Sequence, residues 1–224
     1  MKTNILLELP YLPPVSWMAL AWQSKTLWLE ACENYQKGSY RNRCHIAGPN
    51  GIQRLSVPLE KGKHQQTPIR QVRMAFLQPW KLAHWRSIQT AYGNAPYFEF
   101  YGHELESFYL SGYVELFRLN LALLQWLLKK TGWKGSIRFT QRFASGESLG
   151  ISDFRNAVSP RDASLPQWFQ PAIYPQVFAE RHGFLPNLSS LDLLFCCGKH
   201  SGDILSASLS DHFNSTNTRP GPPS

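Results

Sequence analysis

The spacing of hydrophobic and polar positions along the chain predicts two strong helices. From Pro79 onward, apolar side chains recur at steps of three and four residues, and Gly93 lies just beyond the last of them. Over 113–130, leucine, phenylalanine and tryptophan leave only a narrow polar stripe. We therefore expect helices at about 79–92 and 113–130, the second of them largely buried.

Shorter apolar or alternating runs predict strands. Asn4–Glu8 and Thr26–Ala31 flank a helical run at Val15–Ser24, Gly135–Phe143 alternates late in the chain, and Ile69–Met74 is a further strand candidate. A strand, a helix and a second strand within about 30 residues are typical of the start of an α/β domain.

The stretch from 39 to 58 predicts a β-hairpin at about 40–58. Two β-prone runs flank a connection that contains Asn-Gly, which supplies the positive φ of a tight turn. Alternate side chains of a strand share a face, so Arg41, Arg43 and His45 would point to one side. Such a face suits a phosphate or a carboxylate, and an ordinary solvated sheet face explains the pattern equally well.

These elements favour one α/β or α+β domain over about 1–200. We expect a mixed, mostly antiparallel sheet that contains the hairpin and is covered by the two strong helices. The 224 residues are 43% hydrophobic and 13% aromatic, which suffices for a substantial core. Residues 211–224 carry little apolar surface and are expected to be disordered.

The net charge of +8 favours anionic partners such as phosphates, nucleic acid or an acidic membrane surface. The basic residues are dispersed along the chain, so we expect no nucleic-acid partner. No run of 18 uncharged apolar residues is present, so no membrane span is expected, and the first residues do not form a signal peptide.

Sequence motifs for metals and cofactors are missing. The four cysteines, at 32, 44, 196 and 197, form no CxxC pair, which predicts reduced thiols in a cytoplasmic protein and no metal site. The chain also lacks a GxxxxGK[ST] loop, a GxGxxG turn, a GxSxG elbow and an HExxH helix. Any cofactor is therefore unknown.

Four segments in a fixed order carry a resemblance to a known family. They are LPYLPP, YQKGSYRNRCHI followed by NGIQRLSVPL, WKLAHWRSIQTAYGNAPYF, and YPQVFAERHGFLPNLSSLDLLFCCG. From about Glu8 to Gly198 the chain resembles the WbqC family of bacterial proteins. It departs from the family at Leu9, where glutamine is common, and at Cys196 and Cys197, which precede Gly198-Lys199 instead of a Gly-Pro turn.

The resemblance implies a role in assembling surface polysaccharide. Family members occur in gene clusters for O-antigen, which implies modification of an amino sugar, in some cases by transfer of glycine or another acyl group. We expect a transferase that acylates an amino sugar linked to a nucleotide or a lipid. The alternative is a non-catalytic protein that binds a sugar phosphate or the proteins of a glycan-assembly complex.

Polar positions that match the family supply most candidate site residues. They are Tyr11, Tyr40, Asn42, Arg43, His84, Tyr92, Tyr97, Asn187, Ser189 and Asp192. His84 is the candidate general base, with Asp192 orienting its tautomer, because an imidazole titrates near neutral pH. Arg41 and Arg43 would hold the phosphates of a nucleotide sugar or a developing oxyanion. Packing in the core is the competing interpretation of His84.

Overall fold

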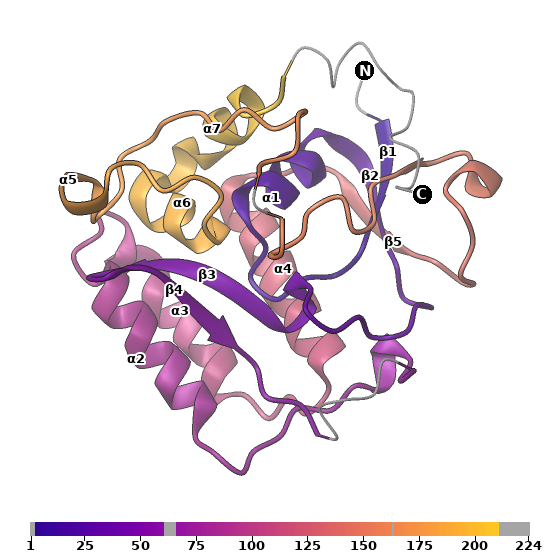
Figure 1. Ribbon diagram of the computed structural model, residues 1–224, viewed down its shortest axis with the longest axis horizontal. Coiled ribbons are helices and arrows are strands. Elements are labelled where there is room, and N and C mark those ends of the chain that lie inside the picture. Colours follow the sequence, from indigo (N-terminus) through magenta and orange to yellow (C-terminus); the bar gives the residue numbers. More distant parts are fainter. Residues whose placement is uncertain (1–2, 61–65, 163, 211–224) are drawn as a thin grey trace.

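The chain folds into a parallel sheet, a separate hairpin and seven helices within the residues that the computed structural model describes, 3–60, 66–162 and 164–210 (Figure 1). The strands are β1 (Thr3–Leu7), β2 (Ser24–Leu29), β3 (Arg43–Gly48), β4 (Gly51–Ser56), β5 (Ser136–Phe139) and β6 (Ser152–Asp153). The helices are α1 (Val15–Gln23), α2 (Trp80–Tyr92), α3 (Phe98–Leu110), α4 (Leu116–Thr131), α5 (Ala179–His182), α6 (Ser190–Cys197) and α7 (Ser201–Ala207). The predicted disordered tail at 211–224 lies outside the described residues.

The main sheet is parallel, so the prediction of a mostly antiparallel sheet was wrong. Its strand order is β5-β2-β1-β6, and every neighbouring pair runs in the same direction. The physical reason is the helix between β1 and β2, because a helical crossover returns the chain to the same end of the sheet. Ile5, Leu6 and Leu7 are all fully buried, as expected of a strand that is covered on both faces.

The predicted hairpin exists but forms a second, two-stranded sheet. Its strands β3 and β4 are antiparallel and close at Gly48 and Gly51. The first strand starts later than expected, because Tyr40–Asn42 form a 3₁₀ turn in which the backbone N–H of Arg41 donates to the Ser39 hydroxyl. The alternating strand face therefore does not extend back to Arg41, and the predicted basic face of three side chains is not formed.

The two strong helices are confirmed as α2 and α4. Helix α4 runs through the middle of the molecule, with the parallel sheet on one side and the hairpin, α2 and α3 on the other (Figure 1). It ends at Gly132, which adopts a left-handed conformation at φ 86°. Helix α3 is not among the elements expected from the sequence, and the strand expected at Ile69–Met74 is a 3₁₀ turn at Ile69–Gln71.

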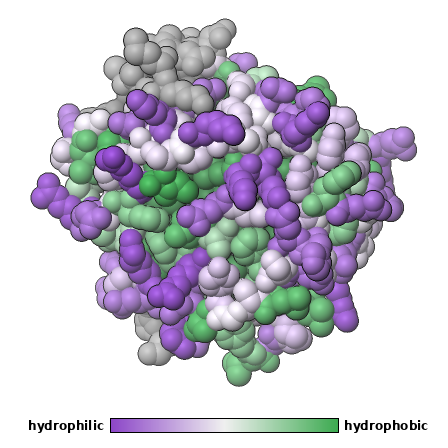
Figure 2. All heavy atoms as spheres, turned by 180° about the vertical axis from the view of Figure 1, so that it is seen from behind, coloured by the Kyte–Doolittle hydropathy of each residue, from purple (hydrophilic) through white to green (hydrophobic). Residues whose placement is uncertain are grey.

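One continuous hydrophobic core joins the sheet to the helices. Hydrophilic and hydrophobic residues are interspersed over the back of the molecule, and hydrophobic residues reach the surface along its lower edge (Figure 2). None of the helices in the described part of the chain combines the length and the apolar character that crossing a bilayer requires.

Candidate functional site

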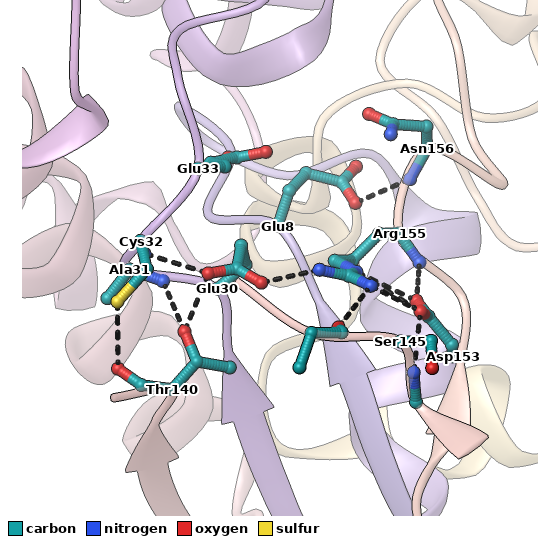
Figure 3. Close-up of polar contacts among 12 residues, drawn as sticks. Glu8, Glu30, Ala31, Cys32, Glu33, Thr140, Ser145, Asp153, Arg155 and Asn156 are labelled. Atoms are coloured by element: carbon teal, nitrogen blue, oxygen red, sulfur yellow. Dashed lines mark hydrogen bonds and ion pairs between the residues drawn. The ribbon is translucent and has the colours of Figure 1, made fainter. Parts of the chain in front are cut away.

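The carboxyl ends of the parallel strands bring polar side chains to one edge of the sheet (Figure 3). Glu8 follows β1, Glu30 follows β2, Thr140 follows β5, and Asp153 ends β6. The pairing register aligns the ends of β1, β2 and β5. Ligands of open parallel sheets bind outside the carboxyl ends of the strands. We therefore take this edge as the candidate site.

Arg155 links two of the carboxyl groups at this edge. Its Nη1 donates to Glu30 Oε2 at 2.5 Å, and its Nη2 donates to Asp153 Oδ2 at 2.6 Å. The other oxygen of Glu30 accepts a hydrogen bond from the Thr140 hydroxyl at 2.6 Å and one from the Cys32 backbone N–H at 2.7 Å. The charge-assisted bonds tie β2, β5 and β6 together and fix the floor of the site.

Glu33 forms a buried ion pair with Arg41. The guanidinium donates from Nε to Oε1 at 2.7 Å and from Nη2 to Oε2 at 2.5 Å, and both side chains are almost completely buried. Burial raises the pKa of Glu33 above its ordinary value, the Arg41 guanidinium opposes this, and the charges of Glu8 and Glu30 add to the increase. A carboxyl group with a raised pKa is a better proton acceptor near neutral pH.

A pocket of about 600 Å³ opens beside Glu33. Its other lining residues are Cys32, Asn34, Tyr35, Gln36, Lys37, Phe143 and Arg161. The volume lies in the range of small-molecule sites. Lys37 and Arg161 are exposed, so the cavity combines one buried carboxyl group with two solvated cations.

The predicted base, His84, lies on α2 and is buried among aromatic side chains. Its Nδ1 lies 2.9 Å from the Tyr11 hydroxyl, which lies 2.7 Å from the Tyr109 hydroxyl. Burial lowers the pKa of His84 to about 4, and the backbone of Ser56 opposes this shift. The buried ring is therefore neutral near pH 7.

The predicted orienting residue, Asp192, lies in a different cluster. Its Oδ2 accepts from the Tyr174 hydroxyl at 2.8 Å and from Gln176 Nε2 at 2.9 Å. Burial raises the pKa of Asp192 to about 6. The hydrogen-bond partners of Asp192 and of His84 are different residues, so the geometry gives no support to a catalytic pair, and catalysis by either stays a prediction.

Two predicted binding residues stabilise helix ends instead of facing the pocket. The Asn187 side chain accepts from the backbone N–H of Ser16 at 2.9 Å, in the first turn of α1. Ser189 is the N-cap of α6, where its hydroxyl accepts from the backbone N–H of Leu191. Serine is preferred at the N-cap because its oxygen satisfies a free backbone donor, and the Asn187 oxygen satisfies such a donor of α1 from a distant part of the chain.

Three further predicted residues make structural contacts. Asn42 donates to the backbone carbonyl of Val57 at 2.9 Å and so fastens the base of the hairpin. The Tyr92 hydroxyl accepts from the backbone N–H of Ala47 at 3.1 Å, which attaches the hairpin to α2. The ring of Tyr97 packs on Gly198, where an added Cβ would lie 2.5 Å from the ring.

Arg43 and Tyr40 are the remaining predicted residues. Burial lowers the pKa of Arg43, and the charges of Arg54 and Arg161 act in the same direction. Burial raises the pKa of Tyr40 to about 12, and its hydroxyl lies 3.4 Å from His45 Nδ1. Ligand binding by Arg41, Arg43 and Tyr40 stays a prediction.

A known protein family matches more than half of this chain. Residues 10–155 match the WbqC-like protein family. The chain belongs to the WbqC-like protein family. The match begins after β1, includes α1, β2, the hairpin, α2–α4, β5 and β6, and its last residue is Arg155. Most of the pocket wall therefore lies in the part of the chain that defines this WbqC-like protein, and Arg161 lies just beyond it.

One curated relative of the WbqC-like chain is the uncharacterized protein Rv1507c of Mycobacterium tuberculosis. The two are 28% identical over 196 residues, which is 76% of this chain and 83% of the relative. No solved structure matches the chain. Among the described residues, no group of three or more histidine, cysteine, aspartate or glutamate side chains is arranged to hold a metal ion.

Most residues of the pocket of this WbqC-like protein carry no local sequence signal. Glu33, Lys37, Phe143 and Arg161 were not selected, because each stands alone in the sequence and they converge only in the fold. One usable signal was present. The two predicted strands at the N-terminal end carry acidic residues at or beside their last position, in LLELP and LWLEACE. The carboxyl ends of parallel strands form ligand sites.

Proposed function

We propose that this protein is a transferase of surface-polysaccharide assembly that acylates the amino group of a sugar linked to a nucleotide or a lipid. Glycine is one acyl group that the family resemblance suggests. The reaction would take place in the pocket formed by segments that follow the carboxyl ends of β2 and β5. Membership of the WbqC-like family and the charge distribution of the pocket support the proposal.

The observation that carries the proposal is the combination of Glu33 with Lys37 and Arg161 in one cavity. An amino sugar on a phosphate carrier has a cationic amine at one end and an anionic phosphate at the other. The buried carboxyl group suits the amine, and the exposed cations suit the phosphate. A substrate bound in this orientation would place its nitrogen near a proton acceptor.

The chemical step needs an activated acyl donor, an ester or a thioester. The sugar nitrogen attacks the carbonyl carbon, a C–N bond forms, and the bond from that carbon to the leaving oxygen or sulfur breaks with its electron pair. Glu33 accepts the first proton, which the ammonium must lose before its nitrogen can attack, and the departing oxygen or sulfur takes the second proton as the amide forms. The bidentate bond to Arg41 fixes the orientation of the carboxylate, and each of its oxygens retains a second acceptor site.

The test is to incubate the protein with nucleotide-linked amino sugars and activated acyl donors and to look for the acylated sugar by mass spectrometry. Glu33→Gln should lower kcat at least a hundredfold, which is a typical contribution of general base catalysis. Arg161→Gln should mainly raise KM, because it removes a binding charge. Thermal unfolding of each variant establishes that it is folded.

His84→Gln is the decisive comparison in the same assay. If Glu33 is the base, His84→Gln keeps most of the turnover in protein that remains folded. Loss of turnover in folded His84→Gln, with Glu33→Gln still active, would return the catalytic role to His84 and refute the assignment made here.

A non-catalytic binding role is the second candidate, and a specific observation favours it. Glu33 is paired with Arg41, and Glu30 and Asp153 are both paired with Arg155. Carboxylates held in ion pairs are weaker proton acceptors than free ones. A sugar phosphate that stabilises the protein against heat, without any change in its own mass in the presence of every donor, would support this role over catalysis.

A further inference from the structure

Phe143 presents an open aromatic face to the pocket. The side chain is 62% exposed and belongs to the pocket wall. The Arg155 guanidinium carbon lies 4.7 Å from the ring centroid, so a cation supports one face of the ring. Arg155 is itself held by Glu30, by Asp153 and by the backbone carbonyl of Ala144. The ring is therefore backed by a fixed group, and its other face is available for stacking.

The segment from 31 to 36 gives the pocket a polar wall. Burial alternates along it, so that Cys32, Asn34 and Gln36 are exposed while Glu33 and Tyr35 are buried. Backbone hydrogen bonds to the chain at 67–69 hold the segment extended. The amide side chains at 34 and 36 carry both donors and acceptors, which is what the polar edge of a heterocyclic base requires.

Arg161 is held at the pocket by a specific backbone arrangement. Its Nη2 donates to the backbone carbonyl of Lys37 at 2.8 Å, and its guanidinium lies directly against Gly38. Gly38 has φ +81°, and a Cβ there would lie within 2.5 Å of the guanidinium carbon, so this contact requires glycine. The remaining donors of Arg161 stay available for a ligand.

A third arginine adds to the positive charge at this end of the pocket. Arg43 lies close enough to Arg161 for the two charges to repel each other, and within the described residues its Nε is buried without a hydrogen-bond partner. Like charges gathered in this way are stabilised by an anion with several oxygens.

We propose that the outer part of this pocket binds a nucleoside diphosphate, with the base stacked on Phe143 and the two phosphates held by Lys37 and Arg161. The inference rests on the proposed function only for its location, and it deepens that function by naming a nucleotide as the carrier of the sugar. A diphosphate attached to a lipid would use the same cations but would leave the Phe143 face uncovered.

The test is isothermal titration of the full-length protein with UDP, dTDP, CDP, ADP and GDP, and with inorganic pyrophosphate. At least one nucleoside diphosphate should bind about tenfold more tightly than pyrophosphate, because stacking of one base on an aromatic ring contributes about that factor or more. Phe143→Leu should remove this advantage and leave pyrophosphate binding unchanged, whereas Phe143→Tyr should retain it. Lys37→Gln should weaken both kinds of ligand.

Phe100→Leu is the matched control, because Phe100 is 69% exposed on α3 and is not part of the pocket wall. It should bind every ligand as the wild type does. Equal affinity for pyrophosphate and for all nucleotides, unaffected by Phe143→Leu, would overturn the proposal and leave a simple phosphate site. Absence of binding by all the probes would overturn it too.

The outcomes also separate this inference from the proposed transferase. Nucleotide binding that depends on Phe143, without acyl transfer to any nucleotide-linked or lipid-linked amino sugar, would support the nucleotide site and refute the transferase. Acyl transfer to a lipid-linked amino sugar, with no nucleotide affinity, would support the transferase and refute the nucleotide site.

Discussion

Two regions of this protein contain buried ionisable groups, and they differ in their access to ligand. His84 and Asp192 lie among aromatic rings and helix ends, where other side chains surround them. Glu33 is equally buried but belongs to the wall of a pocket. Burial is the largest cause of the pKa change in all three groups. A shifted pKa thus reports burial, and only the pocket adds the access that a reaction needs.

The two regions also differ in the hydrogen-bond and ion-pair partners of their buried ionisable groups. The carboxyl groups at the sheet edge face guanidinium groups, as in the Glu33–Arg41 pair. The His84 and Asp192 clusters use neutral hydroxyl and amide partners, and burial favours the uncharged form of each group. Substitutions in the first region should therefore expose unpaired charge, and substitutions in the second should expose unpaired dipoles.

The largest expected effect tests this difference in charge. Arg41→Met should lower the free energy of unfolding by about 3–5 kcal/mol, because it leaves Glu33 buried without its counter-ion. His84→Gln, at a neutral position of similar burial, should cost about 1–3 kcal/mol. Urea unfolding measures both.

The double variant Arg41→Met/Glu33→Gln sharpens the same comparison. It removes both charges and should recover much of the lost stability, since a buried pair can often be replaced by neutral groups. Equal losses for Arg41→Met and His84→Gln would show that the two regions do not differ in the way described here.

A second prediction concerns pH. The folded pKa of His84 is about 4, below its ordinary value, so the stability it contributes is present above about pH 6.5 and is lost as the pH falls toward 4. The folded pKa of Asp192 is about 6, above its ordinary value, so its contribution is present at low pH and is lost as the pH rises through 6. Each contribution is about 3 kcal/mol, and the two nearly cancel between pH 4 and 6.

Single substitutions should separate the two contributions. Relative to the wild type, Asp192→Asn should gain stability as the pH rises from 4 to 6, and His84→Gln should lose stability over the same interval. Urea midpoints at pH 4, 5, 6 and 7 measure both slopes. If the urea midpoints of the wild type and both variants changed with pH in the same way, the pKa values of His84 and Asp192 would not be shifted as described.

A third prediction addresses the glycine beneath Arg161. Gly38→Ala should cost about 1–2 kcal/mol, because an L-residue with positive φ is strained, and it should also weaken anion binding by displacing the guanidinium. Gly51→Ala is the matched control, since Gly51 has φ +102° but no atom within 4 Å of an added Cβ. It should lose similar stability and keep full ligand affinity. Equal ligand affinities of Gly38→Ala and Gly51→Ala would show that Arg161 does not take part in anion binding.

The smallest expected effect concerns Ser189, the N-cap of α6. Ser189→Ala removes the N-cap of α6 and should cost about 1 kcal/mol of stability with no change in ligand affinity. Ser107→Ala, at an exposed position on α3, should be nearly neutral. Calorimetric melting measures the difference. A specific loss of ligand affinity in Ser189→Ala would restore the binding role that the family resemblance suggested.

The parts of the fold that were predictable are those with local signals. The periodicity of α2 and α4 and the Asn-Gly turn of the hairpin lie within single segments of the sequence. The 3₁₀ turn at Tyr40–Asn42 was missed because its residues also favour strands. Helix α3 was missed because Gly102 and a run of aromatic residues resemble a turn. The two-residue strand β6 gives almost no sequence signal.

The direction of the sheet and the composition of the pocket depend on long-range contacts. The run Ile5–Leu7 is apolar at every position, which indicates a strand buried on both faces and could have favoured a parallel sheet. The approach of Arg161 to Lys37 crosses 124 residues and follows no local pattern. The polar residues that matched the family remain open as functional predictions, although several of them cap helices or hold the hairpin.

The strand order has a consequence for folding during synthesis on the ribosome. β1 and β2 emerge first, but their outer neighbours β6 and β5 follow more than a hundred residues later. Contacts of such long range form slowly, because the entropy cost of closing a large loop comes before the favourable energy of the contacts. A nascent chain that ends before Arg161 therefore has no complete pocket, and until then the edges of β1 and β2 depend on chaperones or neighbouring helices for protection.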